Sequence, residues 1–144
     1  MTNKPIIQNV SRQDIVDGNV MSTKDKTLLI QISDHDLCFP VPANWLTFVE
    51  THQFKFLDAE DNTQADESHK FSKEQAKQIG DILQAALANN QNVIVHCTAG
   101  LCRSGAVAEV GSMLGFDLTN RRRQPNIRVK SMLMSYFGWG YSNF

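Results

Sequence analysis

The chain has 144 residues, of which 42% are hydrophobic and 20% charged, and its formal net charge is −1. This composition is that of an ordinary globular protein, so we expect one domain over residues 1–144. The small net charge gives no overall attraction to nucleic acid or to a membrane. No apolar run reaches the roughly 20 residues of a membrane helix. The first residues lack a signal-peptide core, and three cysteines are too few for a disulfide framework, which favours a cytoplasmic protein.

The first predicted elements are two strands and a short helix. Residues 27–32 (TLLIQI) form an apolar run followed by the turn-like SDHD, which predicts a buried strand. Residues 41–52 fit a short helix beginning at Ala43 or Asn44, since large apolar residues follow at helical spacing. Residues 54–57 (FKFL) are predicted to form a second strand.

A polar loop and a long helix come next. Residues 58–67 carry several carboxylates and no large apolar residue, so we expect a loop. Ser72 and Gln75 then form a capping-box pattern, which predicts that a helix begins there. Its apolar stripe continues to Leu87, and Asn89 is expected to end it.

The second half of the chain repeats the alternation of strand and helix. Residues 92–97 (NVIVHC) are apolar on both faces, as in a central parallel strand covered by helices. A helix rich in small residues is expected over 104–115, and a last helix over 129–136. This order predicts an α/β fold, with a central and mostly parallel sheet flanked by helices. Ligands of such sheets bind beyond the carboxyl ends of the strands, where residue 97 lies.

The segment HCTAGLCRSG (residues 96–105) carries the strongest chemical pattern. Cys97 ends a strand, and Arg103 stands at the start of the next helix. A loop between them can turn its backbone N–H groups inward and make a nest for a dianion. Arg103 can bind two phosphate oxygens with its planar guanidinium, and Gly100 allows the backbone angles of a tight loop. The expected phosphate-binding loop consists of Thr98, Ala99, Gly100, Leu101, Cys102 and Arg103.

The same environment favours a nucleophilic thiolate. A helix N-terminus or a nearby cation can lower the pKa of a cysteine by several units. Cys97 would then be placed for in-line attack on a bound phosphate, and Ser104 could hydrogen-bond its sulfur. Zinc binding through His96, Cys97 and Cys102 is disfavoured, because adjacent strand residues point to opposite faces and no suitable fourth ligand follows.

These residues resemble the His-Cys-x5-Arg-Ser signature of the protein tyrosine phosphatase superfamily, and the short chain resembles its compact dual-specificity branch and the small bacterial or phage-type members. The resemblance implies a cysteine-based phosphatase fold, a phosphocysteine intermediate on Cys97 and transition-state binding by Arg103. It implies that His96 orients the nucleophile and that no metal or other cofactor takes part. A downstream Pro-Asn pair is similar to the segment that opens the last helix of dual-specificity phosphatases, where the asparagine, here Asn126, supports the phosphate loop.

The reaction also needs a general acid for the leaving group. The resemblance places this aspartate after the strand that precedes the long helix, where several carboxylates compete. Asp58 stands directly at the strand end, and Asp61 lies shortly after it. We give these two equal weight and place Asp66 behind them.

The resemblance implies hydrolysis of phosphotyrosine in a phosphorylated protein, with phosphoserine and phosphothreonine left open as additional substrates. Two alternatives remain: a phosphatase of RNA 5′ ends or nucleotides, and a phosphoprotein-binding module without turnover. The basic run 121–123 is either a solvated face or a rim that attracts phosphorylated substrate. Cys102 is either a neutral loop residue or a thiol that traps oxidised Cys97 as a disulfide.

Overall fold

The computed structural model describes residues 4–20, 26–43 and 45–139. Their order is β1 (Ile6–Ser11), α1 (Arg12–Asp17), β2 (Thr27–Ser33), η1 (Trp45–Thr47), β3 (Phe48–Lys55), η2 (Glu67–His69), α2 (Lys73–Ala88), β4 (Asn92–Cys97), α3 (Arg103–Leu114), β5 (Asp117–Leu118) and α4 (Ile127–Tyr136). No helix within these ranges is long and apolar enough to cross a membrane.

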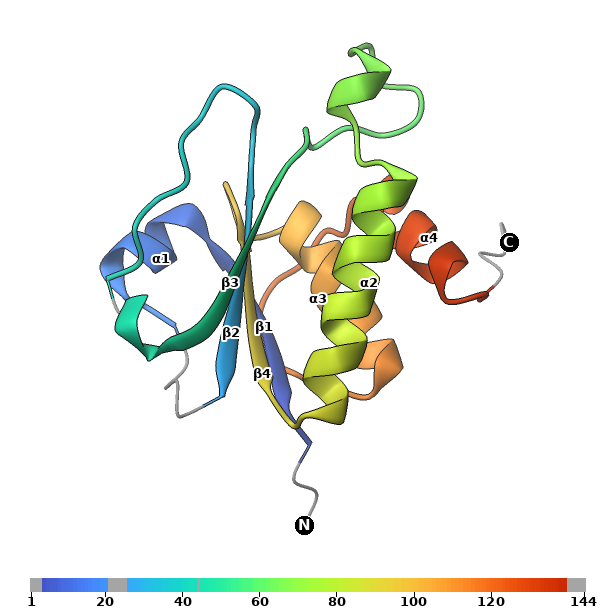
Figure 1. Cartoon of the computed structure of the whole chain (residues 1–144). Helices are drawn as coiled ribbons and strands as arrows, with labels where there is room; N and C mark the ends of the chain where they lie inside the picture. The colour runs from blue at the N-terminus through green and yellow to red at the C-terminus, as the bar shows by residue number, and fades with distance from the viewer. Residues whose placement is uncertain (1–3, 21–25, 44, 140–144) are drawn as a thin grey trace.

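The strands form one five-stranded sheet in the order β3-β2-β4-β1-β5, and every neighbouring pair is parallel. Helices α2, α3 and α4 cover one face of this sheet, and α1 lies against the other (Figure 1). The α/β fold with a mostly parallel sheet is therefore confirmed.

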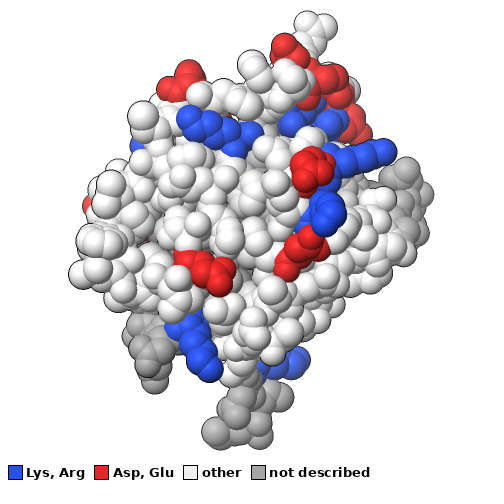
Figure 2. Space-filling model, in the orientation of Figure 1, with Lys and Arg blue, Asp and Glu red and all other residues white. Residues whose placement is uncertain are grey.

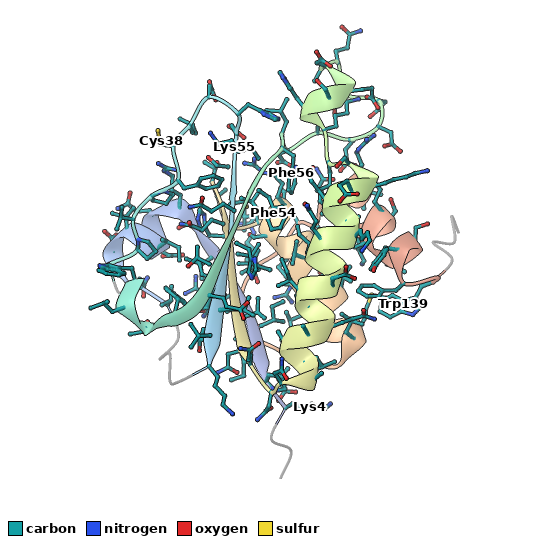
Figure 3. The ribbon with its side chains drawn as sticks, in the orientation of Figure 1. Lys4, Cys38, Phe54, Lys55, Phe56 and Trp139 are labelled. Atoms are coloured by element: carbon teal, nitrogen blue, oxygen red, sulfur yellow. The ribbon has the colours of Figure 1, made fainter. Side chains whose placement is uncertain are left out.

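Two apolar clusters hold the layers together. The larger cluster fills the space between the sheet and helices α2, α3 and α4, and it includes Phe54 and Phe56, which lie between β3 and α2 in Figure 3. The smaller cluster joins Ile15 of α1 to the opposite face of the sheet. Because helices cover both faces, the central strands β2 and β4 are almost wholly buried.

The predicted helix over 41–52 is wrong. Only Trp45–Thr47 form a single 3-10 turn, and Phe48–Lys55 continue as strand β3. This strand lies at the edge of the sheet and pairs with β2, so its backbone hydrogen bonds override the helical spacing of its apolar residues. The predicted start at Ala43 is not a helix start, and Asn44 lies outside the described residues.

Of the predicted strand over 54–57, only Phe54 and Lys55 belong to β3, whereas the remaining predicted elements lie close to their expected places. Helix α2 begins after a capping box formed by Ser72 and Gln75, and Asn89 caps its end. Strands β1 and β2 flank β4, and all three end at the same edge of the sheet. Segments that follow these strands therefore meet around the loop after Cys97.

Candidate active site

The loop from Cys97 to Arg103 passes from the end of β4 to the start of α3. None of the backbone N–H groups of residues 98–102 donates to another group within the described part of the chain. Thr98 and Ala99 are exposed, so an anion can approach this row of free donors from solvent. A series of unpaired N–H groups at a helix start is the arrangement that binds phosphate.

Gly100 is required by the close approach of this loop to β1. Its φ is +75°, and a Cβ atom there would lie 2.5 Å from the carbonyl carbon of Val10 and 2.6 Å from the nitrogen of Ser11. Both contacts are with backbone atoms of β1, which cannot move without disrupting the sheet. Any other residue at position 100 would therefore displace the loop from the sheet.

Strand β1 and the first residue of α1 also hold the loop through hydrogen bonds. The side-chain amide of Asn9, which is buried, donates to the carbonyl oxygen of Gly100 at 2.7 Å and to that of Arg122 at 3.1 Å. The backbone N–H of Arg12 donates to the carbonyl of Thr98 at 3.1 Å. Sequence reasoning missed these contacts, because it predicted no element before residue 27.

Asn126 supports the loop from its other side. Its backbone N–H donates to the carbonyl of Cys102 at 3.0 Å, and its side-chain Oδ1 accepts from the N–H of Val129 at 3.0 Å. The residue therefore caps helix α4 and contacts the loop at the same time. Its Nδ2 donates to Asp58 Oδ1 at 2.8 Å, so Asn126 also connects the loop to the acidic segment after β3.

Cys97 is a free thiol at the closed end of the loop, and it is only 2% exposed. Its Sγ lies 3.1 Å from Oγ of Ser104, a contact in which either atom can donate. When the sulfur is a thiolate, the serine hydroxyl donates and stabilises the negative charge. Ser104 therefore stands where it can help the sulfur both as a nucleophile and as a leaving group.

Arg103 is held with one edge of its guanidinium free. Its Nη1 donates to Asp34 Oδ1 at 2.7 Å and to the carbonyl of Phe56 at 2.8 Å, and its Nη2 donates to Thr98 Oγ1 at 3.1 Å. Nε is buried and has no hydrogen-bond partner among the described residues. A guanidinium carries five N–H bonds, so the two that remain are on Nε and Nη2, which share one edge. That edge can bind two phosphate oxygens.

Asp34 is the site residue that sequence reasoning missed. It follows the last residue of β2, the strand beside β4, and its carboxylate is one-third exposed and paired with Arg103. The SDHD segment by itself predicts only a turn. The sequence did contain a signal for Asp34: it is an acidic residue directly after a buried strand. Such a residue lies at the ligand-binding edge, because the carboxyl ends of parallel strands meet there.

His96 is fully buried on β4, directly before Cys97 in the chain. Burial lowers its pKa from 6.5 to about 4, because an imidazolium would lose its hydration there. The ring is therefore neutral at neutral pH. Neither ring nitrogen has a side-chain hydrogen-bond partner among the described residues, so the orienting role of His96 stays a prediction.

The buried imidazole gives stability a defined pH dependence. We expect the free energy of unfolding to fall between pH 6.5 and pH 4, since the unfolded chain binds a proton at His96 that the folded chain excludes. The loss is on the order of 3 kcal/mol. Denaturant unfolding at pH 7, 5.5 and 4 measures it. In the His96→Gln variant the dependence in this window should weaken, and an unchanged dependence would contradict the assignment.

The three candidate carboxylates have different surroundings. Asp58 contacts Asn126 and also lies beside the thiol of Cys102, whose pKa is raised by burial and by this carboxylate. Asp61 is exposed and pairs with Arg128 at 2.8 Å, at the start of α4. Asp66 caps the short η2 helix through the backbone N–H of Ser68. Of the three, only Asp58 contacts residues that belong to the phosphate loop or hold it.

The acidic segment forms a distinct charged surface. Figure 2 shows acidic side chains gathered at the upper right, where Figure 1 places the connection between β3 and α2. Cations within the fold balance several of them: Arg128 contacts Asp61 and Glu67, and Lys70 contacts Glu67. Among the described residues, no group of three or more His, Cys, Asp or Glu side chains is placed to hold a metal ion.

The structure places a buried cysteine and a loop of free N–H groups at the carboxyl edge of a parallel α/β sheet. Human DUSP28 matches the fold with a TM-score of 0.60 at 16% identity, over 93% of this chain and 92% of its own. The human tyrosine phosphatase-like serine/threonine/tyrosine-interacting protein matches with a TM-score of 0.59 at 17% identity, over 89% and 88% of the two chains. A mouse putative dual-specificity phosphatase, solved with zinc tungstate, gives 0.51 at 13%, over 88% and 78%.

The chain therefore has the fold of dual-specificity and tyrosine phosphatase structures. No family model matches its sequence, and no curated protein sequence does either. At these identities the likeness concerns the fold, so activity must be argued from the site itself.

Proposed function

We propose that this protein is a cysteine-dependent phosphatase that hydrolyses phosphotyrosine in phosphorylated proteins. The observation that carries the proposal is the arrangement around Cys97: a buried thiol lies at the base of a loop of free N–H donors, beside the unoccupied edge of Arg103. A phosphate monoester matches these donors in charge and shape. Phosphoserine and phosphothreonine are additional substrates to test in the same assay.

In the first step, the Cys97 thiolate attacks phosphorus and the bond to the leaving oxygen breaks. The transition state spreads charge over the equatorial oxygens, where the loop N–H groups and the free edge of Arg103 would hold it. Asp58 is the carboxyl group that we assign to protonate the leaving oxygen. Its contact with Asn126 keeps it at the rim of the loop.

In the second step, water attacks the phosphocysteine and the sulfur leaves. Ser104 would stabilise the departing thiolate, since its hydroxyl already lies 3.1 Å from Sγ. Asp58, now deprotonated, would accept a proton from the attacking water. Asp58 thus reverses its role between the two steps, since it gives up a proton in the first and accepts one in the second.

The pH dependence of the reaction tests this assignment. We expect Asp58→Asn to lower kcat for a phosphorylated tyrosine peptide by about 10²- to 10⁴-fold and to remove the basic limb of the pH–rate profile. That limb reports loss of the proton from the general acid as the pH rises. Steady-state rates of the wild type and the variant between pH 4.5 and pH 8.5 measure it.

Asp61→Asn and Asp66→Asn are matched controls, because each removes a carboxylate of the same segment that contacts no residue of the loop. Both should retain the basic limb. If Asp61→Asn or Asp66→Asn loses it instead, that residue is the acid. A wild type that binds phosphopeptide without any turnover would favour the binding-module alternative.

A further inference from the structure

Residues 58–61, the acid-bearing segment after β3, are attached to the start of helix α4. Asp58 accepts a hydrogen bond from the side-chain amide of Asn126, and the carbonyl of Ala59 accepts a second one from the same amide at 3.1 Å. Glu60 and Asp61 both contact residues that directly follow Asn126. Because Asn126 also donates its backbone N–H to the phosphate loop, the start of α4 joins this segment to the loop.

Glu60 makes a two-point attachment to the helix. One of its carboxylate oxygens accepts from the backbone N–H of Ile127 and the other from that of Arg128, each at 2.8 Å. Asn126 accepts from the N–H of the next residue, Val129. The first N–H groups of a helix have no acceptor within it, so Glu60 satisfies two donors of α4 that would otherwise need water. A carboxylate there also interacts favourably with the positive end of the helix dipole.

The backbone of Glu60 is fixed as well. Its N–H donates to Oγ1 of Thr63 at 2.8 Å, and its carbonyl accepts from the N–H of Thr63 at 3.1 Å, so the two bonds close a turn. Ala59, directly before Glu60, is 3% exposed, whereas Asp58 is exposed. The segment is thus held from the side of Glu60, and the carboxyl group of Asp58 remains open to a substrate.

The position of the acid matters for its chemistry. A general acid must lie within hydrogen-bond distance, about 2.6–3.2 Å, of the leaving oxygen. A displacement of about 1 Å can lower a rate by about 10²-fold. Asp58 stands on the connection between β3 and α2, where the short turn Glu67–His69 is the longest helical element. Such a connection holds a side chain in place only where it is fastened, and Glu60 provides a fastening two residues after Asp58.

We infer that Glu60 is a positioning residue, which fastens the acid-bearing segment to the first turn of α4 and so keeps Asp58 at the rim of the phosphate loop. The inference rests on the proposed function, and it adds a residue that acts on the departure of the leaving group. Glu60 does not contact the reacting phosphate in this scheme, because it acts through Asp58.

The test uses two phosphate esters that differ in their need for the acid. The tyrosine oxygen, with a pKa of about 10, is a poor leaving group and needs a proton, whereas dinitrophenolate leaves without one. For Glu60→Ala we expect kcat/KM to fall by about 10²-fold with a phosphotyrosine peptide and to change less than about twofold with dinitrophenyl phosphate. The basic limb of the pH–rate profile for the peptide should weaken. A residue that only stabilises α4 would lower both rates alike.

Glu74→Ala is the matched control, since it removes an exposed carboxylate from the first turn of another helix, α2. It should change neither rate. Glu60→Gln keeps one acceptor oxygen and loses the charge, so its loss with the peptide should be smaller than that of Glu60→Ala. If Glu60→Ala does not fold, Glu60→Gln decides the question, and an unchanged ratio of the two kcat/KM values would then overturn the inference.

Double variants show whether Glu60 acts through the general acid. On the Asp58→Asn background, Glu60→Ala should cause no further loss of kcat/KM with the peptide. An additive loss on this background and on the Asp61→Asn background would overturn the inference. If the effect of Glu60→Ala disappears on the Asp61→Asn background only, the role of Asp58 in the proposed function fails, whereas the positioning role of Glu60 stands.

The dinitrophenyl ester separates this inference from the proposed function. If the wild type hydrolyses neither ester, the proposed function fails and the inference fails with it. If the wild type hydrolyses both and Glu60→Ala lowers both rates equally, the proposed function stands and the inference alone fails.

Discussion

Replacing Cys97 by serine is expected to lower kcat for an aryl phosphate by at least about 10⁴-fold, the scale seen when a catalytic nucleophile is removed. A serine hydroxyl in this loop stays protonated at neutral pH and cannot attack phosphorus as the thiolate does. Steady-state turnover of the wild type and the variant measures the effect. Rapid acid quench of the wild type should also trap phosphate bound to the protein.

Cys38→Ser is the control for this experiment, because Cys38 is an exposed free thiol on the connection between β2 and β3 (Figure 3). It should retain wild-type turnover. The Cys97→Ser variant should still bind inorganic phosphate, since the loop N–H groups and Arg103 are unchanged. Turnover that persists in Cys97→Ser, with no trapped phosphate in the wild type, would refute the covalent mechanism.

Replacing Arg103 by lysine should lower kcat/KM by about 10²- to 10³-fold, the loss typical of one preorganised transition-state donor. A lysine keeps the positive charge but lacks the two parallel N–H bonds of the free guanidinium edge. It also loses the contacts to Asp34, Phe56 and Thr98 that hold this edge in place. Steady-state kinetics with an aryl phosphate measure the effect, and a loss below tenfold would contradict the role of Arg103.

Asp34→Asn tests the contact that holds Arg103 and is compared with Arg103→Lys in the same assay. Asparagine can still accept from Nη1, but it no longer neutralises the guanidinium, so the free edge is less firmly held. We expect a smaller loss than for Arg103→Lys, and a double variant that is no worse than Arg103→Lys alone, because Asp34 acts through Arg103. Additive losses would show that Asp34 has a separate role.

Local patterns in the sequence predicted many of the elements and part of the site. The capping box at Ser72 depends on residues three positions apart, and helix α2 begins there as predicted. The apolar run before Cys97 predicted a buried central strand, and β4 is that strand. The sequence did not predict strand β1, because the polar residues Gln8 and Asn9 interrupt its apolar pattern. Both residues are nonetheless buried. Asn9 is tolerated there because it binds the phosphate loop.

The acidic segment shows the limit of spacing arguments. Asp58 and Asp61 could not be ranked from their distance along the chain. In the structure Asp61 forms an ion pair with Arg128 on α4, whereas Asp58 accepts a hydrogen bond from Asn126 beside the loop. These partners lie far away in the sequence, so no local pattern distinguishes the two carboxylates.

By itself, the sequence determined the order of strands and helices and the loop from Cys97 to Arg103, because each depends on residues that are close in the chain. The close approach of β1 that requires a glycine at position 100 is visible only in the structure. Only the tertiary structure decided that Asp34 holds Arg103, that Asn9 holds the loop, and that Arg121 and Arg123 pair with carboxylates of the fold. The physical reason is the parallel sheet. It brings the carboxyl ends of β1, β2 and β4 to one edge, and so it joins side chains separated by up to about a hundred residues.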